Sequence, residues 1–260
     1  MVVNIPMLET EATNLVVAAE NAGVPADPFW LGADWQRRRG LAHYLDATLL
    51  RADITENDAL ELCDRARGLG AAAVCLNPIW IRAASHRVAG SDTAVAAVVD
   101  FPLGASSGAS RRAEARLAVL DGATELDLVA PLGLLKAARW EELYDDLVSV
   151  IATARPARVK IILETAALSP QEIMISGLIA REAGADWLKS STGFHPAGGA
   201  TIESVRLLRL VAGRRMGVKA SGGIRTLADA ARMLLAGADR LGASALDALS
   251  SDRPLGELVG

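Results

Sequence analysis

The chain has 260 residues, of which 51% are hydrophobic and only 4% aromatic, and its 27 Lys and Arg against 31 Asp and Glu give a formal net charge of -4. This length suits one large α/β domain, and the small negative charge argues against a protein that binds the phosphate backbone of nucleic acid. Two cysteines are too few for a disulfide framework or a metal knuckle, so we expect a reducing, cytoplasmic location.

The first 39 residues are predicted to form a helical extension, with one helix over 8–21 and a connector containing proline and glycine over 23–32. The N-terminus carries acidic residues where a signal peptide has basic ones. The longest uncharged apolar stretch, 68–81, is too short for a membrane span, so no membrane partner is expected. We therefore predict an N-terminal helical extension (1–39), one folded domain (40–250) and a C-terminal tail (251–260).

From residue 40 onward, short runs of Val, Leu, Ile and Ala alternate with amphipathic helical stretches, as in βαβ units with a parallel sheet. Strands are predicted at 41–45, 72–76, 94–99, 125–129, 159–163, 186–189, 217–220 and 240–242. Helices are predicted at 55–69, 79–88, 110–121, 141–154, 170–183, 202–211, 227–236 and 245–249. About eight such pairs close a barrel, so the predicted fold is α/β, a (β/α)8 TIM barrel with a short N-terminal helical extension.

Polar side chains gather where the predicted strands end. In a barrel of this kind the working groups come from the C-terminal ends of the strands. The residues that we assign to these ends are Asp46, Thr48, Cys75, Asn77, Asp100, Glu125, Asp127, Glu164, Lys189, Lys219 and Ser244. This set is too polar for a passive rim, so we expect the functional site there.

Lysine is rare in this chain, and its placement is unusual. It occurs at four positions only, Lys136, Lys160, Lys189 and Lys219, and the last three lie in predicted strands. A buried lysine can lose its proton, whereas arginine stays charged, and a neutral amine can attack a carbonyl group to form a Schiff base. The alternative for any one of them is a lysine whose stem lies on apolar surface and whose head reaches water.

Two of these lysines lie in segments of one design, an apolar residue, a lysine, small hydroxyl residues and glycine: WLKSSTG around Lys189 and GVKASGG around Lys219. A second cation nearby favours the neutral form of a lysine, which suggests Lys189 as nucleophile and Lys219 as its charged neighbour, although spacing alone does not assign the two roles. Asp127 shares a strand face with Glu125 and is the candidate proton carrier. A structural ion network that fills the barrel is the alternative.

Glycine-containing turns follow the last three predicted strands. Loops at this end of a barrel often bind phosphate through backbone amides, and glycine permits a close approach. We therefore expect a phosphorylated substrate at Thr192, Gly193, Gly222, Gly223 and Ser244.

The three histidines, His43, His86 and His195, fall on different elements with no paired spacing. A metal site is therefore not expected, and no cofactor is predicted. Cys75 is expected to pack inside the barrel, because no histidine is placed by the sequence to activate it.

At these motifs the sequence resembles the deoxyribose-phosphate aldolases. The two lysine motifs together are specific for that family, whereas SGGIR alone occurs in other phosphate-binding barrels. The similarity covers about 41–244 in the order of the family. The matching segments are LDATLL (45–50), VCLNP (74–78), DFPLGAS (100–106), GATELDLV (122–129), VKIILET (159–165), LKSSTGF (188–194), GGAT (198–201) and GVKASGGIRT (217–226).

The resemblance implies a metal-independent class I aldolase that interconverts 2-deoxy-D-ribose 5-phosphate with acetaldehyde and D-glyceraldehyde 3-phosphate. It implies that Lys189 forms the Schiff base, that Lys219 favours the neutral form of Lys189, and that Asp127 moves protons with an ordered water. Three further positions, Asp46, Thr48 and Lys160, match polar residues of the substrate pocket. The expected partners are small aldehydes and sugar phosphates, and a homo-oligomer is expected, with a dimer as the first candidate.

One position departs from the family pattern. The family commonly has a pair of serines after the eighth strand, whereas this chain has Ser244 followed by Ala245, which removes one hydroxyl donor from the expected phosphate site. Two alternatives therefore stay open. One is a lysine aldolase of the same fold that acts on a different or unphosphorylated aldehyde pair, and the other is a barrel that binds a sugar phosphate without chemistry.

Overall fold

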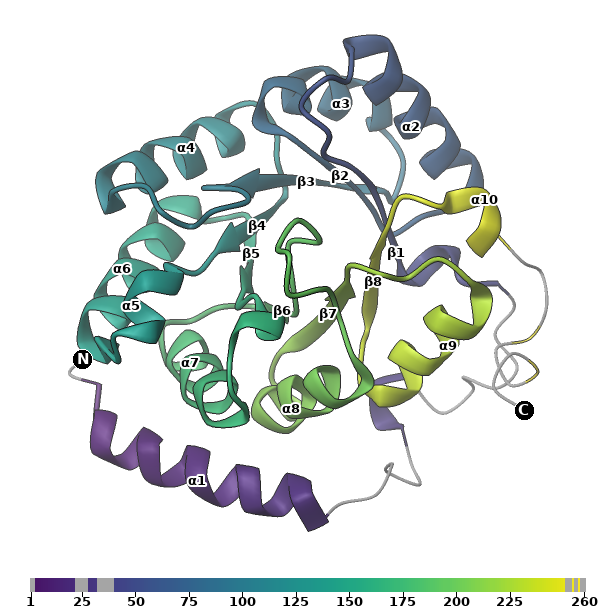
Figure 1. Cartoon of the computed structure of the whole chain (residues 1–260). Helices are drawn as coiled ribbons and strands as arrows, with labels where there is room; N and C mark the ends of the chain where they lie inside the picture. Colours follow the sequence, from purple (N-terminus) through teal and green to yellow (C-terminus); the bar gives the residue numbers. More distant parts are fainter. Residues whose placement is uncertain (1–2, 22–27, 32–39, 251–253, 255–256, 258–260) are drawn as a thin grey trace.

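The computed structural model describes residues 3–21, 28–31, 40–250, 254 and 257, in which eight parallel strands close into a barrel with helices around it (Figure 1). Each strand pairs with the next, and β8 pairs with β1. The strands are β1 (Leu45–Leu49), β2 (Ala73–Leu76), β3 (Ala94–Val99), β4 (Glu125–Val129), β5 (Arg158–Ile162), β6 (Trp187–Lys189), β7 (Gly217–Ser221) and β8 (Arg240–Ala243). The predicted (β/α)8 barrel is confirmed.

Ten α-helices are found in the described part of the chain. They are α1 (Ile5–Asn21), α2 (Glu56–Leu69), α3 (Ile81–Val88), α4 (Gly108–Leu120), α5 (Leu132–Lys136), α6 (Trp140–Ala154), α7 (Pro170–Glu182), α8 (Ile202–Ala212), α9 (Leu227–Ala236) and α10 (Leu246–Leu249). Capping boxes explain why several begin where they do, as at Thr55 with Asp58 before α2 and Ser169 with Glu172 before α7. These signals are local, which is why the predicted helix starts lie close to the observed ones.

The first predicted strand is wrong in position. Residues 41–44 precede the strand: Ala42–Tyr44 form a short 3-10 helix (η3), and β1 follows at Leu45–Leu49, so only Leu45 of the predicted segment lies in the strand. The run LAHYL has the apolar content of a strand, but its buried Leu41 and Tyr44 join the hydrophobic core ahead of β1. As a result Asp46 is the second residue of the strand instead of a residue just beyond its end.

Other differences are smaller. Helix α5 was not predicted, because five residues are too few to show helical periodicity. The predicted helix at 79–88 divides into a 3-10 turn, η4 (Pro78–Trp80), and α3. Two more 3-10 turns, η1 (Phe29–Leu31) and η5 (Thr165–Ala167), complete the described elements.

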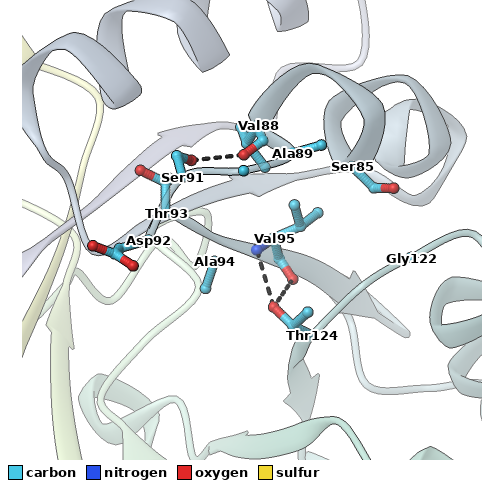
Figure 2. Close-up of a pocket in the computed structure, with 11 residues that line it drawn as sticks. Ser85, Val88, Ala89, Ser91, Asp92, Thr93, Ala94, Val95, Gly122 and Thr124 are labelled. Atoms are coloured by element: carbon cyan, nitrogen blue, oxygen red, sulfur yellow. Dashed lines mark hydrogen bonds between the residues drawn. The ribbon is translucent and has the colours of Figure 1, made fainter.

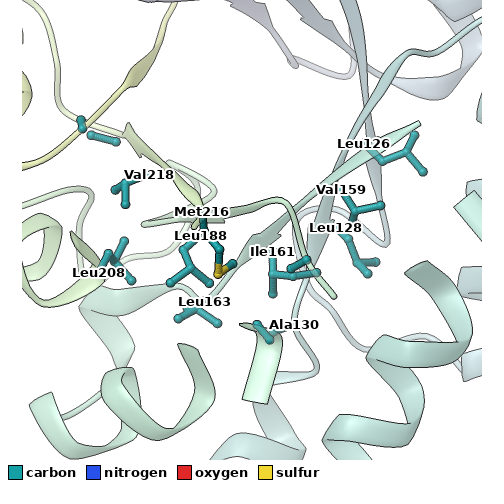
Figure 3. Packing of buried hydrophobic residues seen from close by; sticks show 14 of the residues in the cluster. Leu126, Leu128, Ala130, Val159, Ile161, Leu163, Leu188, Leu208, Met216 and Val218 are labelled. Atoms are coloured by element: carbon teal, nitrogen blue, oxygen red, sulfur yellow. The ribbon is translucent and has the colours of Figure 1, made fainter. Parts of the chain in front are cut away.

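On β4 to β6 the strands point apolar side chains outward and charged side chains inward. On β4 to β6 the outward residues are buried against the helices (Figure 3), and they include Leu126, Leu128, Val159, Ile161 and Leu188. Side chains alternate along a strand, so the residues between them face the barrel axis. This alternation builds the core between strands and helices, and it leaves the interior to charged groups on β4 to β6 and to the small apolar residues Cys75, Ala96 and Val98 on β2 and β3.

Helix α1 lies outside the ring of barrel helices and packs on α7 (Figure 1). Its buried residues Leu8 and Ala12 face the domain, and Glu11 pairs with Arg181 of α7 at 3.1 Å. The predicted helix over 8–21 therefore begins three residues earlier, at Ile5. The connector and the C-terminal tail fall largely outside the described residues, and the division into extension, barrel and tail stays a prediction. Within the described chain, none of the helices combines the length and apolarity that crossing a membrane requires.

Candidate active site

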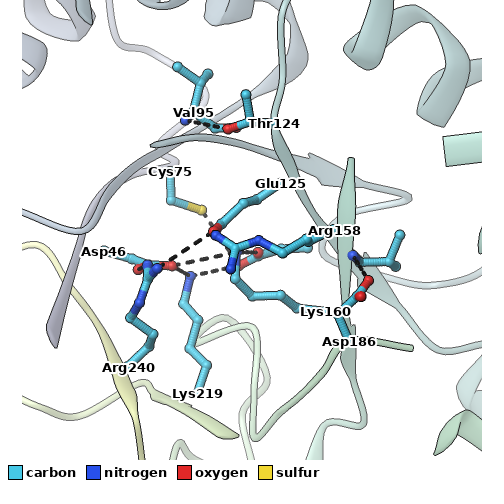
Figure 4. A network of polar contacts seen from close by, with 12 residues as sticks. Asp46, Cys75, Val95, Thr124, Glu125, Arg158, Lys160, Asp186, Lys219 and Arg240 are labelled. Carbon is cyan, nitrogen blue, oxygen red and sulfur yellow. Dashed lines mark hydrogen bonds and ion pairs between the residues drawn. The ribbon is translucent and has the colours of Figure 1, made fainter. Parts of the chain in front are cut away.

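The inside of the barrel holds a cluster of buried charges. Three carboxylates and three amines are each at most 2% exposed to solvent, and they come from five strands. They are Asp46 of β1, Glu125 and Asp127 of β4, Lys160 of β5, Lys189 of β6 and Lys219 of β7. Figure 4 shows most of this network from close by.

Asp127 is the centre of the cluster. Its Oδ1 accepts a hydrogen bond from Lys160 Nζ at 2.9 Å, and its Oδ2 accepts from Lys189 Nζ at 2.8 Å and Lys219 Nζ at 2.7 Å. The strand register explains this geometry, because Asp127 is paired across the sheet with Lys160, and Lys189 with Lys219. Of the three residues that the sequence suggested for catalysis, Asp127 thus contacts both Lys189 and Lys219.

A second layer of charges, which includes Asp46, Glu125 and Arg240 (Figure 4), lies nearer the N-terminal ends of the strands than Asp127 does. Asp46 accepts from Lys219 Nζ at 2.5 Å and from Arg240 at 2.7 Å. Glu125 pairs with Lys160 at 2.5 Å and also with Arg158. The prediction that Glu125 lies at the C-terminal end of a strand is wrong. Glu125 is the first residue of β4 and lies at the opposite end.

Electrostatic interactions within the cluster set the protonation states of Asp127 and Lys219. Burial by itself raises the pKa of Asp127, but Lys160, Lys189 and Lys219 outweigh burial and hold that pKa well below its ordinary value. Burial likewise lowers the pKa of Lys219, but Asp127 and Asp46 outweigh it, so the pKa ends well above its ordinary value. Asp127 is therefore an ionised acceptor and Lys219 a charged donor at neutral pH.

Asp46 and Lys160 follow the same pattern. Burial raises the pKa of Asp46, yet Lys219, Lys160 and Arg240 reverse this effect and leave it far below its ordinary value. Burial lowers the pKa of Lys160, and the carboxylates of Asp127 and Asp46 raise it by more. Both residues are charged at neutral pH, and both belong to the buried charge cluster.

Lys189 connects the charge cluster to a pocket of about 280 Å³ at the C-terminal end of the barrel. Among the described residues, it is the one member of the buried cluster that lines this pocket. The ring of Phe101 has its centroid 5.9 Å from Lys189 Nζ, and Phe194 packs edge-on against Phe101. An amine at the inner end of a pocket, beside aromatic side chains, is accessible to a small carbonyl compound.

The predicted turns line the same pocket. Its wall includes Thr192, Gly193, Gly222, Gly223 and Ser244, which the sequence assigned to substrate binding. Gly222 has φ +85°, and a Cβ there would lie 2.9 Å from both Ser191 Oγ and the backbone of Gly199, so a side chain would not fit. The close approach of these turns brings their backbone into one wall of the pocket.

Thr192 is held in place by Glu164, whose carboxylate accepts from the Thr192 hydroxyl at 2.5 Å and from its backbone N–H at 3.3 Å. Thr48 also lines the pocket, and its hydroxyl donates to the Asp46 carbonyl at 2.7 Å. Asp46 and Lys160 do not line it. Of the predicted binding residues, Asp46 and Lys160 therefore lie in the buried charge cluster, and Thr48 lies in the pocket wall.

Four residues of the site were not singled out from the sequence. Arg51 and Arg225 line the pocket, and Arg158 and Arg240 pair with the buried carboxylates. Arg225 stands in the SGGIR motif, which was a usable signal. No local signal marked Arg158 or Arg240, because each lies at the start of a predicted strand, where a solvated arginine is ordinary.

Cys75 lies beside the cluster. Its Sγ donates to Asp127 Oδ2 at 3.7 Å, and its neighbours include the apolar Ala96 and Val98. Burial raises the pKa of Cys75 above its ordinary value, so the thiol stays protonated at neutral pH. It lacks the thiolate character of a nucleophilic cysteine.

A second cavity, of about 360 Å³, lies at the N-terminal end of β3 (Figure 2). Its wall carries Ser85, Ser91 and Thr124, and Thr124 Oγ1 accepts from the Val95 backbone N–H at 3.1 Å. Asp92 is the single ionisable residue among those that line it. This cavity lacks the paired charges of the barrel interior.

A closed (β/α)8 barrel with a pocket that ends at a lysine, next to a second lysine and a shared aspartate, has the parts of a barrel aldolase. The comparison with protein families agrees. The family model described as DeoC/LacD family aldolase matches residues 41–250, and the chain belongs to this family.

Relatives and solved structures support this assignment. The chain is 45% identical over 211 residues to the deoxyribose-phosphate aldolase of Thermococcus kodakarensis, which covers 80% of this chain and 94% of the relative. It is 43% identical over 201 residues to that of Brevibacillus brevis, covering 77% and 90%. The tetrameric deoxyribose phosphate aldolase of Aeropyrum pernix superposes with a TM-score of 0.74 at 33% identity, covering 80% of this chain and 88% of that one.

Proposed function

We propose that this chain is a class I deoxyribose-phosphate aldolase that interconverts 2-deoxy-D-ribose 5-phosphate with acetaldehyde and D-glyceraldehyde 3-phosphate through a Schiff base on Lys189. One observation carries the proposal: Lys189 lines the pocket and also contacts Asp127, whose Oδ2 it shares with Lys219. The family and the names of the relatives support the substrate.

In the cleavage direction, the free amine of Lys189 adds to C1 of the open-chain sugar, and loss of water gives an iminium ion. The iminium draws the electrons of the C2–C3 bond as the C3 hydroxyl loses its proton. The bond breaks, glyceraldehyde 3-phosphate leaves, and an enamine remains on the lysine. Protonation of the enamine at C2 and addition of water then release acetaldehyde and restore the amine.

Asp127 and Lys219 would serve the proton transfers. Asp127 is ionised and buried next to the nucleophile, so it can accept a proton directly or through water and return it later. Lys219 stays charged 2.7 Å from the same carboxylate oxygen, and a cation there favours the neutral amine on Lys189. Lys160 and Asp46 hold these two groups in place.

The phosphate end of the substrate is assigned to the glycine-containing turns. Gly193, Gly222, Gly223 and Ser244 offer backbone donors, and Arg225 brings positive charge to the same pocket, whereas the charge of Arg51 is paired with Asp53. Thr192 adds a hydroxyl oriented by Glu164. Together these groups suit the phosphate dianion of the substrate, on the side of the pocket away from the buried lysines.

Borohydride trapping tests the proposal. We expect that acetaldehyde and borohydride together leave a stable adduct on the tryptic peptide that carries Lys189, as found by mass mapping, and that Lys136 on the exposed face of α5 stays unmodified. An adduct on Lys219 or Lys160 would keep the reaction class but reassign the nucleophile. Folded protein without any adduct would contradict the aldolase mechanism and favour a barrel that only binds sugar phosphate.

A second candidate, a lysine aldolase for unphosphorylated aldehydes, rests on Ala245, which follows Ser244 at the start of α10. Ala245→Ser is expected to raise kcat/KM for the phosphorylated sugar about tenfold, since a hydrogen bond to a charged group contributes about 1.5 to 3 kcal/mol. The rate with unphosphorylated deoxyribose should not change. Ser244→Ala serves as the matched control and should lower kcat/KM for the phosphorylated sugar. No gain in Ala245→Ser would mean that the missing hydroxyl does not limit phosphate recognition.

The assembly and location of the chain are also proposals. A homo-oligomer, with a dimer as the first candidate, is supported by the tetramer described for the Aeropyrum pernix relative. A cytoplasmic location fits two free, buried cysteines. Light scattering of the purified chain would give the oligomeric state.

A further inference from the structure

The buried charges are balanced without the proton of Lys189. Asp46, Glu125 and Asp127 supply three negative charges inside the barrel. Apart from Lys189, three largely buried cations contact them, Lys160, Lys219 and Arg240, and these supply three positive charges. A proton on Lys189, which is only 2% exposed, would add a fourth positive charge to these buried groups, where uncompensated charge is costly.

Arg240 completes this balance from the N-terminal end of the barrel. One of its Nη atoms lies 2.7 Å from Asp46 Oδ1 and the other 3.6 Å from Glu125 Oε1, so a single guanidinium bridges both carboxylates. Its side chain is 13% exposed, and it lies over the ring of Trp187 at 5.4 Å. Packing and burial thus hold the charge where solvent screens it little.

Arg158 provides a contrast. It pairs with the same Glu125, but half of its side chain is exposed, so water weakens its effect on the interior. The two arginines (Figure 4) therefore differ in depth while sharing one partner. Only the deeper one also reaches Asp46.

We propose that Arg240 is a positioning residue that keeps Lys189 in its reactive free-amine form, by neutralising Asp46 and Glu125 from the end of the barrel opposite the pocket. Without Arg240, three carboxylates would face two buried cations, and protonation of Lys189 would fill the deficit. Arg240 acts through Asp46 and Lys219, since Lys219 bridges Asp46 and Asp127. The inference rests on the proposed role of Lys189 as nucleophile.

The charged and titratable groups around the Lys189 amine come from all sides of the barrel. They are Asp46 of β1, Cys75 of β2, Glu125 and Asp127 of β4, Lys160 of β5 with Glu164 beyond its end, Lys219 of β7, Arg240 of β8, and Arg51 and Arg225 across the pocket. Loss of a cation from this set favours the protonated amine, and loss of an anion favours the free amine. Two substitutions of opposite charge should therefore act in opposite directions.

The test measures the rate of borohydride trapping with acetaldehyde between pH 5 and 9. Arg240→Met is expected to move the acid limb of the profile to higher pH by about one unit, because a neighbouring charge commonly shifts a titration by about 1 to 3 units. Trapping at neutral pH should fall about tenfold and recover in alkali. Glu125→Gln is expected to move the limb to lower pH. A merely structural role would not produce shifts of opposite sign.

Three controls complete the design. Arg240→Lys keeps the charge and should restore the wild-type limb, and Arg158→Met should shift it less than Arg240→Met, because Arg158 is half exposed. Circular dichroism confirms that each variant is folded. If Arg240→Met does not fold, the decision rests on Glu125→Gln and Arg240→Lys.

The outcomes separate this inference from the proposed function. No adduct in the wild-type protein would overturn both. If the wild-type protein forms the adduct, two results would overturn only the role of Arg240. One is an acid limb of the pH profile that moves in neither Arg240→Met nor Glu125→Gln, and the other is a limb that moves in the same direction in both variants. If Arg240→Met is unfolded, an acid limb that does not move in Glu125→Gln would by itself overturn the role of Arg240.

Discussion

Lys189→Leu is expected to lower the rate of aldol cleavage by at least about 10⁴-fold, because loss of a covalent nucleophile costs on the order of 10⁶-fold in a well-studied hydrolase. Leucine keeps most of the apolar stem, and Asp127 retains Lys160 and Lys219 as partners, so the charge cluster stays paired. The loss should therefore fall on kcat, while the fold remains. The rate would be followed by coupling the release of glyceraldehyde 3-phosphate to its reduction.

Lys136→Leu is the matched control. This lysine ends α5, is about half exposed and pairs with Glu172 at 2.9 Å. The same substitution there should leave the cleavage rate unchanged and cost at most about 1 kcal/mol of stability. If Lys189→Leu kept more than about one hundredth of the activity, another amine would have to be the nucleophile.

Asp127→Asn is expected to lower the cleavage rate by about 10²- to 10⁴-fold and to destabilise the fold by about 3 to 5 kcal/mol. The carboxylate accepts hydrogen bonds from three buried amines, and an amide would turn an N–H group toward cations while removing the negative charge. Lys160 and Lys219 would then be short of a counter-charge. Urea unfolding together with the coupled assay would measure both effects.

The effect of this substitution on stability should depend on pH in a defined direction. The pKa of Asp127 is depressed on folding, so its contribution to stability is present above the pKa of the unfolded chain, about 3.9, and is lost as the pH falls toward the folded pKa. The difference between wild type and Asp127→Asn should be constant from about pH 5 to 8 and shrink below about pH 4.

Asp186→Asn is the control for Asp127→Asn. Asp186 accepts from the Val159 N–H at 2.8 Å and pairs with Arg155 at 2.9 Å, at a partly exposed place outside the barrel interior. Its loss should cost no more than about 1.5 kcal/mol and leave the rate unchanged. Equal stability of Asp127→Asn and wild type would mean that the three lysines find counter-charge elsewhere.

The elements that the sequence predicted best are those written in local patterns. β3 and β4 lie at the predicted residues, because each is a run of alternating or fully apolar residues bounded by turns. Helix α9 likewise begins and ends where expected, since Thr226 forms a capping box and Gly237 ends the helix. The first predicted strand, 41–45, was wrong because an apolar pattern does not by itself fix the backbone conformation: Ala42–Tyr44 form a 3-10 turn, and the strand begins only at Leu45.

By itself, the sequence determined the order of strands and helices, the placement of Lys189 and Lys219 in strands, and the glycine-containing turns that follow these strands. These features depend on residues within about one element of each other. Only the tertiary structure decided that Asp127 contacts three amines, that Glu125 lies at the far end of the barrel, and that Arg240 bridges Asp46 and Glu125. Those contacts join residues 33 to 194 positions apart, and their geometry follows from the register of a closed sheet, which no local pattern contains.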